Sequence, residues 1–521
     1  MLNKTFYLSC GIALISASCT PKQGSTPKKP NVLFISIDDL RPELGCYGVD
    51  EIQTPHLDKF ATKSVTFTRA YCQTAACAPS RASIMTGLRP DSTRVWHLKD
   101  KFRKTIPDVL TMPQYFHKHG YYTVSMGKTF HNHMPDSISF DEPDLRPEEY
   151  RTKDMIDRDP ESFYYDEAIK EELRQVRDQR LKKNPNVYAG GWGYGRAIEV
   201  ADCEDHELYD GAQTDLAIET MKRLKEKEQP FFLALGYYRP HLPFVTPRKY
   251  WELYDRDKLP LAPNPFLPKN SPVMAMNSSY ELSACYDMKD VHHPSVKKQP
   301  EEMARKLKHG YYASVSYVDA CVGKLLKGLD VLGLAENTIV VVWGDHGWKL
   351  GEHGSWCKQT NYNTDTRVPL LIYAPGIKGK GQKCDRLVEL LDLFPTIGEL
   401  AGIEVESYLQ GTSMVPLLNN PNLKWKEMAF SQFHRRPKVT PDGGRYMGYS
   451  MITDRYHLVE WYVWDDDKGM RKEFVARELY SHKIDPEENE NIAGYPENRE
   501  LVHLLSEKLK VSWNKKFIYN E

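Results

Sequence analysis

Continuous apolar runs alternate with amphipathic stretches over most of the chain. The apolar runs, rich in β-branched residues, cover 31–38, 121–127, 230–236, 337–345 and 368–376. The amphipathic stretches between them include 210–227, 303–332 and 387–401. An unbroken apolar strand is buried on both faces, so strands of this kind separated by helices predict a mostly parallel sheet covered by helices on both sides. We therefore expect an α/β fold.

Polar side chains follow four of these predicted strands directly. They are Asp38 and Asp39, then Lys128 and His131, then Arg239 and His241, and finally Asp345 and His346. Ligands of open α/β sheets bind beyond the carboxyl ends of the strands. We therefore expect these carboxylates, imidazoles and cations to converge on one site.

The sequence pattern changes near residue 420. Beyond it, short aromatic runs such as "RYMGYSMITD" and "RYHLVEWYVW" precede an amphipathic stretch at about 498–510. This order predicts a catalytic α/β domain over 31–420 and a smaller antiparallel-sheet-plus-helix subdomain over 421–521. The polar segment 131–210 has little periodicity, and we interpret it as an insertion over the mouth of the site.

The first residues have the pattern of an export signal. "MLNKTFYLSCGIALISASC" combines Lys4 with a short apolar run and small residues before Cys19. This predicts a signal peptide over 1–19 rather than a membrane span. Acylation of Cys19, with 20–30 as a tether, and simple cleavage near Ser18 are the two alternatives. We expect an exported protein, periplasmic or anchored in the outer membrane, that meets a membrane only through such a lipid anchor.

Charge and cysteine content exclude several classes of function. The 521 residues contain 70 Lys and Arg against 71 Asp and Glu, so no overall field attracts nucleic acid. The chain has 10 cysteines. Without Cys10, Cys19 and Cys77 an odd number remains, and no CxxC spacing occurs among them. The cysteines therefore predict neither a zinc site nor a disulfide framework.

The two polar pairs Asp38–Asp39 and Asp345–His346 predict a metal site. Neighbouring carboxylates at a strand end repel each other unless a cation lies between them. Three carboxylates and one imidazole form an oxygen-rich set that suits Ca²⁺, or Mg²⁺, better than zinc or copper. The alternative for Asp39 alone is a helix cap.

The stretch "TAACAPSRASIMTG" at 74–87 contains the most specific motif. Pro79 suits the first turn of a helix, which would place Cys77 at the positive end of the helix dipole, with Arg81 one turn further on. A buried cysteine and a surface salt bridge of Arg81 are the structural alternatives. The pattern C-x-P-S-R-x-x-x-x-T-G resembles that of the type I sulfatases. It is supplied by Cys77, Pro79, Ser80, Arg81, Thr86 and Gly87.

The resemblance implies an alkaline-phosphatase-like fold and a defined chemistry. A maturase oxidises the family's cysteine to formylglycine, whose hydrate attacks the sulfur of a sulfate ester. The implied metal ligands are Asp38, Asp39, Cys77, Asp345 and His346. Among the remaining residues, Arg81 and Lys128 would stabilise the sulfoenzyme charge, His241 and Lys358 would protonate the leaving oxygen, and His131 would act as the base that releases sulfate.

Several segments resemble the iduronate-2-sulfatase branch of this family. They are "MGKTFH", "GYYRPHLPF", "GDHGWKLGEHGSWCKQTNYN", "MGYSMITDRYHL" and "ELYSHKIDPEENENIA". The likeness implies a sulfated saccharide substrate, with a 2-O-sulfated uronic acid as the first candidate; Trp348 would line the sugar pocket, and Arg239 is expected to bind substrate. The segments 131–210 and 434–445 are where specificity should reside. Alternatives are another sulfated glycan, a phosphatase or phosphodiesterase of the same superfamily, and a glycan-binding protein without activity.

Overall fold

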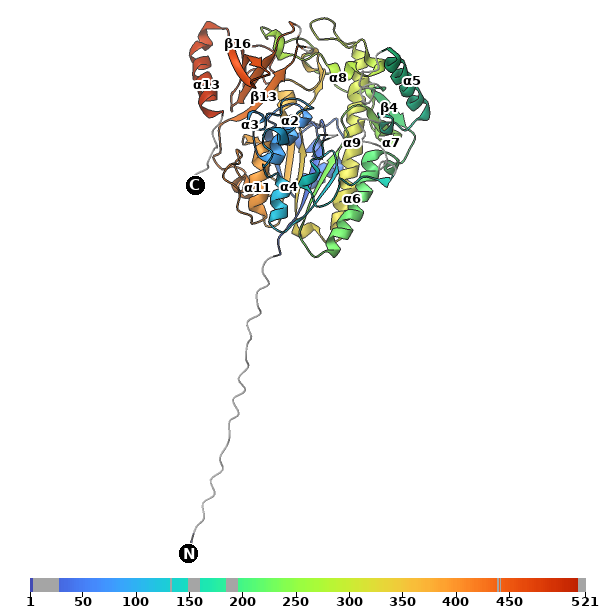
Figure 1. Cartoon of the computed structure of the whole chain (residues 1–521), viewed down its shortest axis with the longest axis vertical. Helices are drawn as coiled ribbons and strands as arrows, with labels where there is room; N and C mark the ends of the chain where they lie inside the picture. The colour runs from blue at the N-terminus through green and yellow to red at the C-terminus, as the bar shows by residue number, and fades with distance from the viewer. Residues whose placement is uncertain are drawn as a thin grey trace.

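An eight-stranded mixed sheet forms the centre of the protein, which is described here from a computed structural model (Figure 1). The structure describes residues 1–2, 28–131, 134–148, 160–183, 195–437, 440 and 442–513. The strand order is β11-β2-β10-β7-β1-β5-β3, and β12 also pairs with β2. The strands are β1 (Asn31–Ile37), β2 (Val65–Tyr71), β3 (Tyr122–Gly127), β5 (Phe231–Tyr237), β7 (Thr338–Gly344), β10 (Arg367–Tyr373), β11 (Lys383–Cys384) and β12 (Val388–Glu389).

The predicted parallel arrangement is confirmed for one side of the sheet. β3, β5, β1 and β7 are parallel neighbours, whereas β10 is antiparallel to both β7 and β2. β2 was not predicted. Its sequence "VTFTRAY" has polar side chains at alternate positions and is only partly buried at Thr68 and Arg69, so it lacks the unbroken apolar run on which the prediction depended.

Helices cover both faces of the sheet, as the alternating pattern predicts. Successive side chains of β1 point to opposite faces. Leu33 and Ile35 belong to one core cluster, which includes residues of α1, α6 and α9. Val32 and Phe34 belong to a second cluster with residues of α2, α4 and α11. The helices of these layers are α1 (Pro55–Ala61), α2 (Cys77–Thr86), α4 (Met112–Lys118), α6 (Tyr209–Glu226), α9 (Glu301–Val331) and α11 (Leu393–Leu400).

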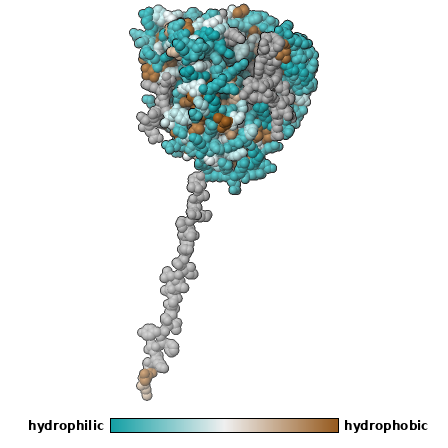
Figure 2. Space-filling view, viewed as in Figure 1, coloured by the Kyte–Doolittle hydropathy of each residue, from teal (hydrophilic) through white to brown (hydrophobic). Residues whose placement is uncertain are grey.

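Shorter elements complete this layer arrangement. The remaining helices include α3 (Pro90–Thr93), α5 (Glu167–Lys183), α7 (Arg248–Trp251), α8 (Tyr280–Ser283), α10 (Asn363–Thr366) and α12 (Val415–Asn419). Two small sheets pair β4 (Ile198–Ala201) with β6 (Phe244–Pro247) and β8 (Lys349–Leu350) with β9 (Trp356–Cys357). The face shown in Figure 2 is mostly hydrophilic with scattered apolar spots.

A four-stranded antiparallel sheet and a helix form the C-terminal part, as predicted. The sheet runs in chain order through β13 (Ala429–Arg435), β14 (Tyr446–Ile452), β15 (Tyr456–Asp465) and β16 (Met470–Ser481). Helix α13 (Arg499–Ser512) packs on it through Leu505 and Leu509. β13 also lies beside the segment before α2, because Gln432 N donates to Gln73 O (2.8 Å). The domain boundary near residue 420 stays a prediction.

The predicted signal peptide, Cys19 and most of the tether lie outside the described residues. Within the described ranges, no helix combines the length and apolar character that a membrane crossing requires. Export and lipid anchoring therefore stay predictions.

Candidate active site

The carboxyl ends of β3, β1 and β7 bring predicted site residues together. Asp39 N donates to Asp345 Oδ1 (3.1 Å), which joins the ends of β1 and β7. Lys128, after β3, forms an ion pair with Asp38. These side chains are all buried. The predicted convergence is therefore present at the carboxyl ends of β7, β1 and β3, with β5 between β1 and β3 in the sheet.

Cys77 begins helix α2 and faces this cluster. Ala76 before it is extended, so the helix starts at the cysteine. Cys77 Sγ lies 3.2 Å from His346 Nε2 and 3.7 Å from Lys128 Nζ. Burial, and then the charge of Asp38, raise the pKa of the thiol well above its usual value. A thiol held neutral in this way is a poor nucleophile.

Arg81, one turn further along α2, forms hydrogen bonds with residues at the carboxyl ends of β1, β3 and β7. Its Nε donates to Asp345 Oδ2 (2.9 Å) and its Nη2 to Asp38 Oδ1 (3.2 Å). Nη1 donates to Ser36 Oγ (3.0 Å) and to the carbonyl of Lys128. Although burial opposes its charge, the two aspartates raise the pKa of Arg81. The guanidinium is therefore a fixed charge, and the surface salt-bridge alternative is wrong, since the side chain is fully buried.

Four side chains of the cluster form a candidate site for a metal ion. Ligand atoms of Asp38, Asp39, Cys77 and His346 all lie within 4.8 Å of one another. His346 Nδ1 lies 3.1 Å from Gly347 O, which leaves Nε2 for the cluster, 3.5 Å from Asp39 Oδ1. Burial, reinforced by the charge of Asp38, raises the pKa of Asp39 well above its usual range. A cation between the carboxylates would relieve this repulsion.

Lys358 and His241 close the other side of the cluster. Lys358 Nζ lies 2.8 and 3.0 Å from the two oxygens of Asp39. Although burial opposes its charge, Asp39 raises the pKa of Lys358 well above the usual value. His241 Nδ1 lies 2.6 Å from Leu242 O, so Nε2 faces Asp38 and Asp39 at 3.9 and 3.8 Å. Burial, followed by the charges of Lys358 and Lys128, lowers the pKa of His241 well below its usual value.

Glu281 is a site residue that the sequence analysis missed. Its Oε2 lies 2.9 Å from Lys358 Nζ, and its Oε1 accepts a hydrogen bond from Gln359 Nε2 (3.0 Å). It lies on α8, a single short turn in a segment without periodicity. A carboxylate there has no motif around it, so only the fold reveals its position.

The other predicted residues lie around this cluster rather than in it. His131 lines a cavity of about 230 Å³ that Ala78, the neighbour of Cys77, also lines. The guanidinium of Arg239 donates to Val245 O (3.1 Å) and to Phe163 O (3.4 Å), so it connects its own loop to the segment before α5. Trp348 is buried, and Lys358 Nζ lies 5.1 Å from its ring. Substrate binding by Arg239 and Trp348 stays a prediction, as does the role of His131 as the base that releases sulfate.

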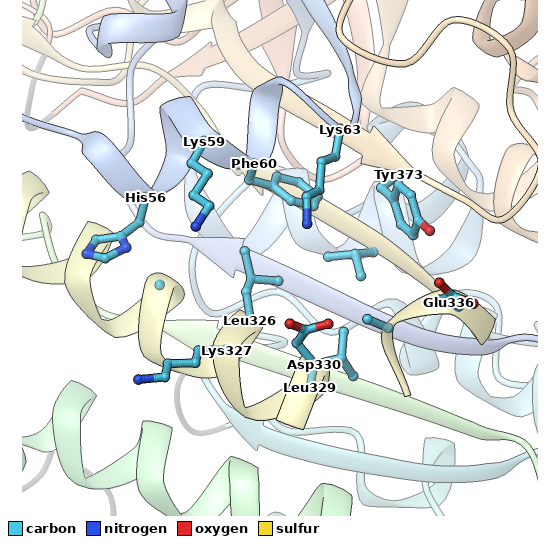
Figure 3. A pocket seen from close by; sticks show the side chains of 13 residues that line it. His56, Lys59, Phe60, Lys63, Leu326, Lys327, Leu329, Asp330, Glu336 and Tyr373 are labelled. Atoms are coloured by element: carbon cyan, nitrogen blue, oxygen red, sulfur yellow. The ribbon is translucent and has the colours of Figure 1, made fainter. Parts of the chain in front are cut away.

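A cavity of about 410 Å³ lies elsewhere among the described residues (Figure 3). It is formed by residues of α1 and α9, with Val340 early in β7 and Tyr373 at the end of β10. Val340 and Tyr373 therefore lie at the end of the strands opposite to Asp38 and Asp345. None of the predicted site residues lines this cavity.

Removal of divalent cations should destabilise the protein. A cation that binds only the folded chain adds about 2.7 kcal/mol at a hundred times its Kd, so Ca²⁺ should raise the Tm of chelator-treated protein, as measured by calorimetry. Asp38→Asn should abolish this rise. Asp454→Asn, a change at a side chain that is 72% exposed, should leave it intact, and equal responses of both variants would contradict the assigned site.

Comparisons with known proteins agree with this geometry. The Sulfatase family matches residues 30–403, and the family described as N-sulphoglucosamine sulphohydrolase, C-terminal, matches residues 351–515. The iduronate 2-sulfatase of Mus musculus is 32% identical, over 96% of this chain and 97% of its own length.

Solved structures share the fold. A phosphonate monoester hydrolase of Agrobacterium radiobacter has a TM-score of 0.70 at 21% identity, covering 92% of this chain and 95% of that one. A 2-O GAG sulfatase has a TM-score of 0.64 at 22% identity, covering 93% of each chain. The predicted fold class and the predicted membership are confirmed, and this chain belongs to the sulfatase family.

Proposed function

We propose that this sulfatase removes the sulfate ester of a saccharide, with the 2-O-sulfate of a uronic acid as the first candidate. The observation that carries the proposal is the position of Cys77. Its Sγ lies at the start of α2, within 3.2 Å of His346 Nε2 and 3.7 Å of Lys128 Nζ. The whole-length similarity to an iduronate 2-sulfatase supports the choice of sugar.

The nucleophile we propose is the hydrate of formylglycine at position 77. A neutral buried thiol is poorly suited to attack sulfur, whereas a hydrate oxygen beside the ammonium of Lys128 can do so. One hydroxyl of the hydrate gives its proton to a carboxylate of the cluster and forms a bond to sulfur, while the bond from sulfur to the sugar oxygen breaks. A Ca²⁺ or Mg²⁺ ion held by Asp38, Asp39, Asp345 and His346 would draw charge from the sulfate oxygens.

The leaving oxygen takes its proton from the Lys358 side of the site. An alkoxide is a stronger base than an amine, so proton transfer from the ammonium of Lys358 is favourable. The imidazole of His241 lies beside Asp39, the carboxylate that Lys358 contacts, with Nε2 3.8 Å from Asp39 Oδ2. It can orient the sugar oxygen or pass on the proton.

Release of sulfate needs a base at the second hydroxyl. As this hydroxyl loses its proton, a carbonyl forms at carbon, the bond from carbon to the sulfated oxygen breaks, and sulfate leaves. Addition of water to the aldehyde restores the hydrate. We assign the base to His131, which is half-buried and shares a cavity wall with Ala78.

The test is the mass of the peptide that contains Cys77, followed by sulfate release. Conversion to formylglycine lowers the peptide mass by roughly 18 Da and identifies the nucleophilic class. Converted protein should release sulfate from 2-O-sulfated uronyl disaccharides faster than from 6-O- or N-sulfated ones. Release of phosphate by protein with an unmodified thiol would contradict the proposal. Preference for another sulfated position would correct only the sugar.

A further inference from the structure

The cavity between α1 and α9 combines an apolar wall with a rim of lysines (Figure 3). Its apolar lining includes Phe60 of α1, Leu326 and Leu329 of α9 and Val340 of β7. All of these except Leu326, which is half-buried, are buried. A volume of about 410 Å³ lies in the range of small-molecule sites in proteins. An apolar space of this size can take a hydrocarbon chain.

Lysines surround the opening of this cavity. Lys59 and Lys63 line it from α1 and the turn after α1, and Figure 3 shows both side chains extending towards the α9 wall. Lys327 of α9 is a third lining lysine, and Lys380 Nζ lies 5.4 Å from the ring of Tyr373, which also lines the cavity. All four lysines are exposed, and none of them forms an ion pair with a described carboxylate.

The charges at the opening favour an anion over a cation. The lining carboxylates are Asp330 and Glu336, so two negative charges stand against four lysines. Neither carboxylate forms an ion pair with a described residue. A phosphate group could therefore bind these ammonium groups without breaking an existing ion pair, and several lysines together attract anionic lipid headgroups.

The chain enters the fold beside this cavity. The carbonyl of Lys29 accepts a hydrogen bond from Asn337 Nδ2 (3.2 Å), and Asn337 follows Glu336 of the cavity lining. Cys19, the predicted site of acylation, precedes Lys29 by ten residues. Ten extended residues span at most about 36 Å. A lipid attached at Cys19 would therefore keep the cavity close to a bilayer.

We propose that this cavity binds an anionic phospholipid, with an acyl chain against Phe60, Leu326 and Leu329 and the phosphate at Lys59 and Lys63. Chain and headgroup both contribute, because a buried hydrocarbon chain and nearby lysines add separate attractions. The site provides a second membrane contact besides the predicted anchor. Because the cavity lies at the end of the strands opposite to Asp38 and Asp345, a lipid bound there would leave the candidate active site facing away from the bilayer.

The test uses short-chain lipids below their micelle concentration. Dihexanoyl phosphatidylglycerol carries both groups that the cavity should bind, dihexanoyl phosphatidylcholine lacks the net negative charge, and glycerol 3-phosphate lacks the chains. In calorimetric titrations of the full chain, phosphatidylglycerol should have a Kd at least roughly tenfold lower than either of the others. Added salt should reduce its advantage over phosphatidylcholine, because salt screens exposed charges.

Two variants separate the rim from the apolar wall. The rim variant combines Lys59→Gln, Lys63→Gln and Lys327→Gln, and it should raise the Kd of phosphatidylglycerol to that of phosphatidylcholine. Leu326→Trp fills the cavity, and it should weaken the binding of both lipids roughly tenfold or more.

The charge-matched control replaces three lysines outside the cavity lining. Lys297, Lys298 and Lys508 are exposed, and their joint replacement by glutamine should leave every Kd unchanged. The Tm and the sulfate release of each variant report on folding, and substitutions at exposed positions should leave the activity within about twofold of the parent. If Leu326→Trp lowers the Tm, the rim variant, which changes exposed side chains only, decides the result.

The proposal is overturned if phosphatidylcholine or glycerol 3-phosphate binds as tightly as phosphatidylglycerol, because headgroup charge or acyl chain is then not recognised. Failure of phosphatidylglycerol to bind below its micelle concentration overturns it too. So does equal binding by the rim variant and the control, which would place the lipid elsewhere. These titrations need no turnover, so a chain without sulfatase activity would refute the proposed function and leave the lipid site to be decided by its own Kd values.

Discussion

Replacement of Cys77 by alanine should abolish sulfate release while leaving substrate binding intact. Loss of a nucleophile costs about 10⁴-fold or more in kcat, because the remaining groups can bind the ester but cannot form the covalent intermediate. Arg81 and Lys128 would still bind the sulfate. Sulfate release, measured by ion chromatography, should fall to background, while calorimetric titration with a sulfated disaccharide should give a Kd within a few-fold of the parent KM.

Cys72→Ala is the matched control for this change. Cys72 is another buried cysteine just before α2, and its Sγ lies 3.9 Å from the carbonyl of Asp365. It faces no site residue in the described contacts, so its removal should cost some stability and little activity. If Cys77→Ala kept more than about a tenth of the parent kcat, position 77 would not supply the nucleophile.

Loss of Lys358 should impair hydrolysis of sugar sulfates far more than hydrolysis of aryl sulfates. A sugar alkoxide needs a proton as it leaves, whereas a stabilised phenolate does not. A positioned acid contributes about 10²- to 10⁴-fold, so Lys358→Ala should lower kcat by that factor on the disaccharide and by less than about tenfold on 4-methylumbelliferyl sulfate. Glu281→Gln should give the same pattern with a smaller loss, because Glu281 Oε2 holds Nζ at 2.9 Å.

The control for Lys358 is a second buried lysine. Lys349 contacts Asp365 and donates to Thr360 Oγ1 (2.6 Å) without touching the cluster in the described contacts. Lys349→Met should therefore change the activity on the disaccharide and on the aryl sulfate by the same factor. It should also change the Tm. An equal loss on the two substrates after Lys358→Ala would assign that lysine to charge balance around Asp39 rather than to leaving-group protonation.

Strand ends were the part of the site that the sequence could predict. An unbroken apolar run marks a strand buried on both faces, and the polar residue after it must lie at the sheet edge, so Asp38, Lys128 and Asp345 could be grouped without a structure. The motif around Cys77 then fixed the start of a helix through Pro79. Both patterns are local. In the structure Asp38, Lys128 and Asp345 lie in one cluster, and α2 begins at Cys77.

Other features depend on packing that no local pattern records. The direction of β10 is antiparallel although its apolar run looks like that of β7. Glu281 reaches Lys358 from a single turn of helix, far from any motif. Arg239 follows a predicted strand like its neighbours, yet its guanidinium donates to a carbonyl of its own loop, Val245 O. In each case long-range contacts decide the outcome, and these contacts are invisible in the spacing of residues.

The proposed oxidation of Cys77 depends on when β13 docks against the segment before α2. An enzyme that oxidises Cys77 needs to reach its sulfur, and the folded chain leaves this residue 2% exposed. The carbonyls of Cys72 and Gln73 accept hydrogen bonds from Ser431 and Gln432. These two donors are synthesised more than 350 residues after the acceptors. The proposed oxidation of Cys77 would therefore have to precede docking of the C-terminal sheet, and a chain that docked this sheet first would keep an unmodified thiol at position 77.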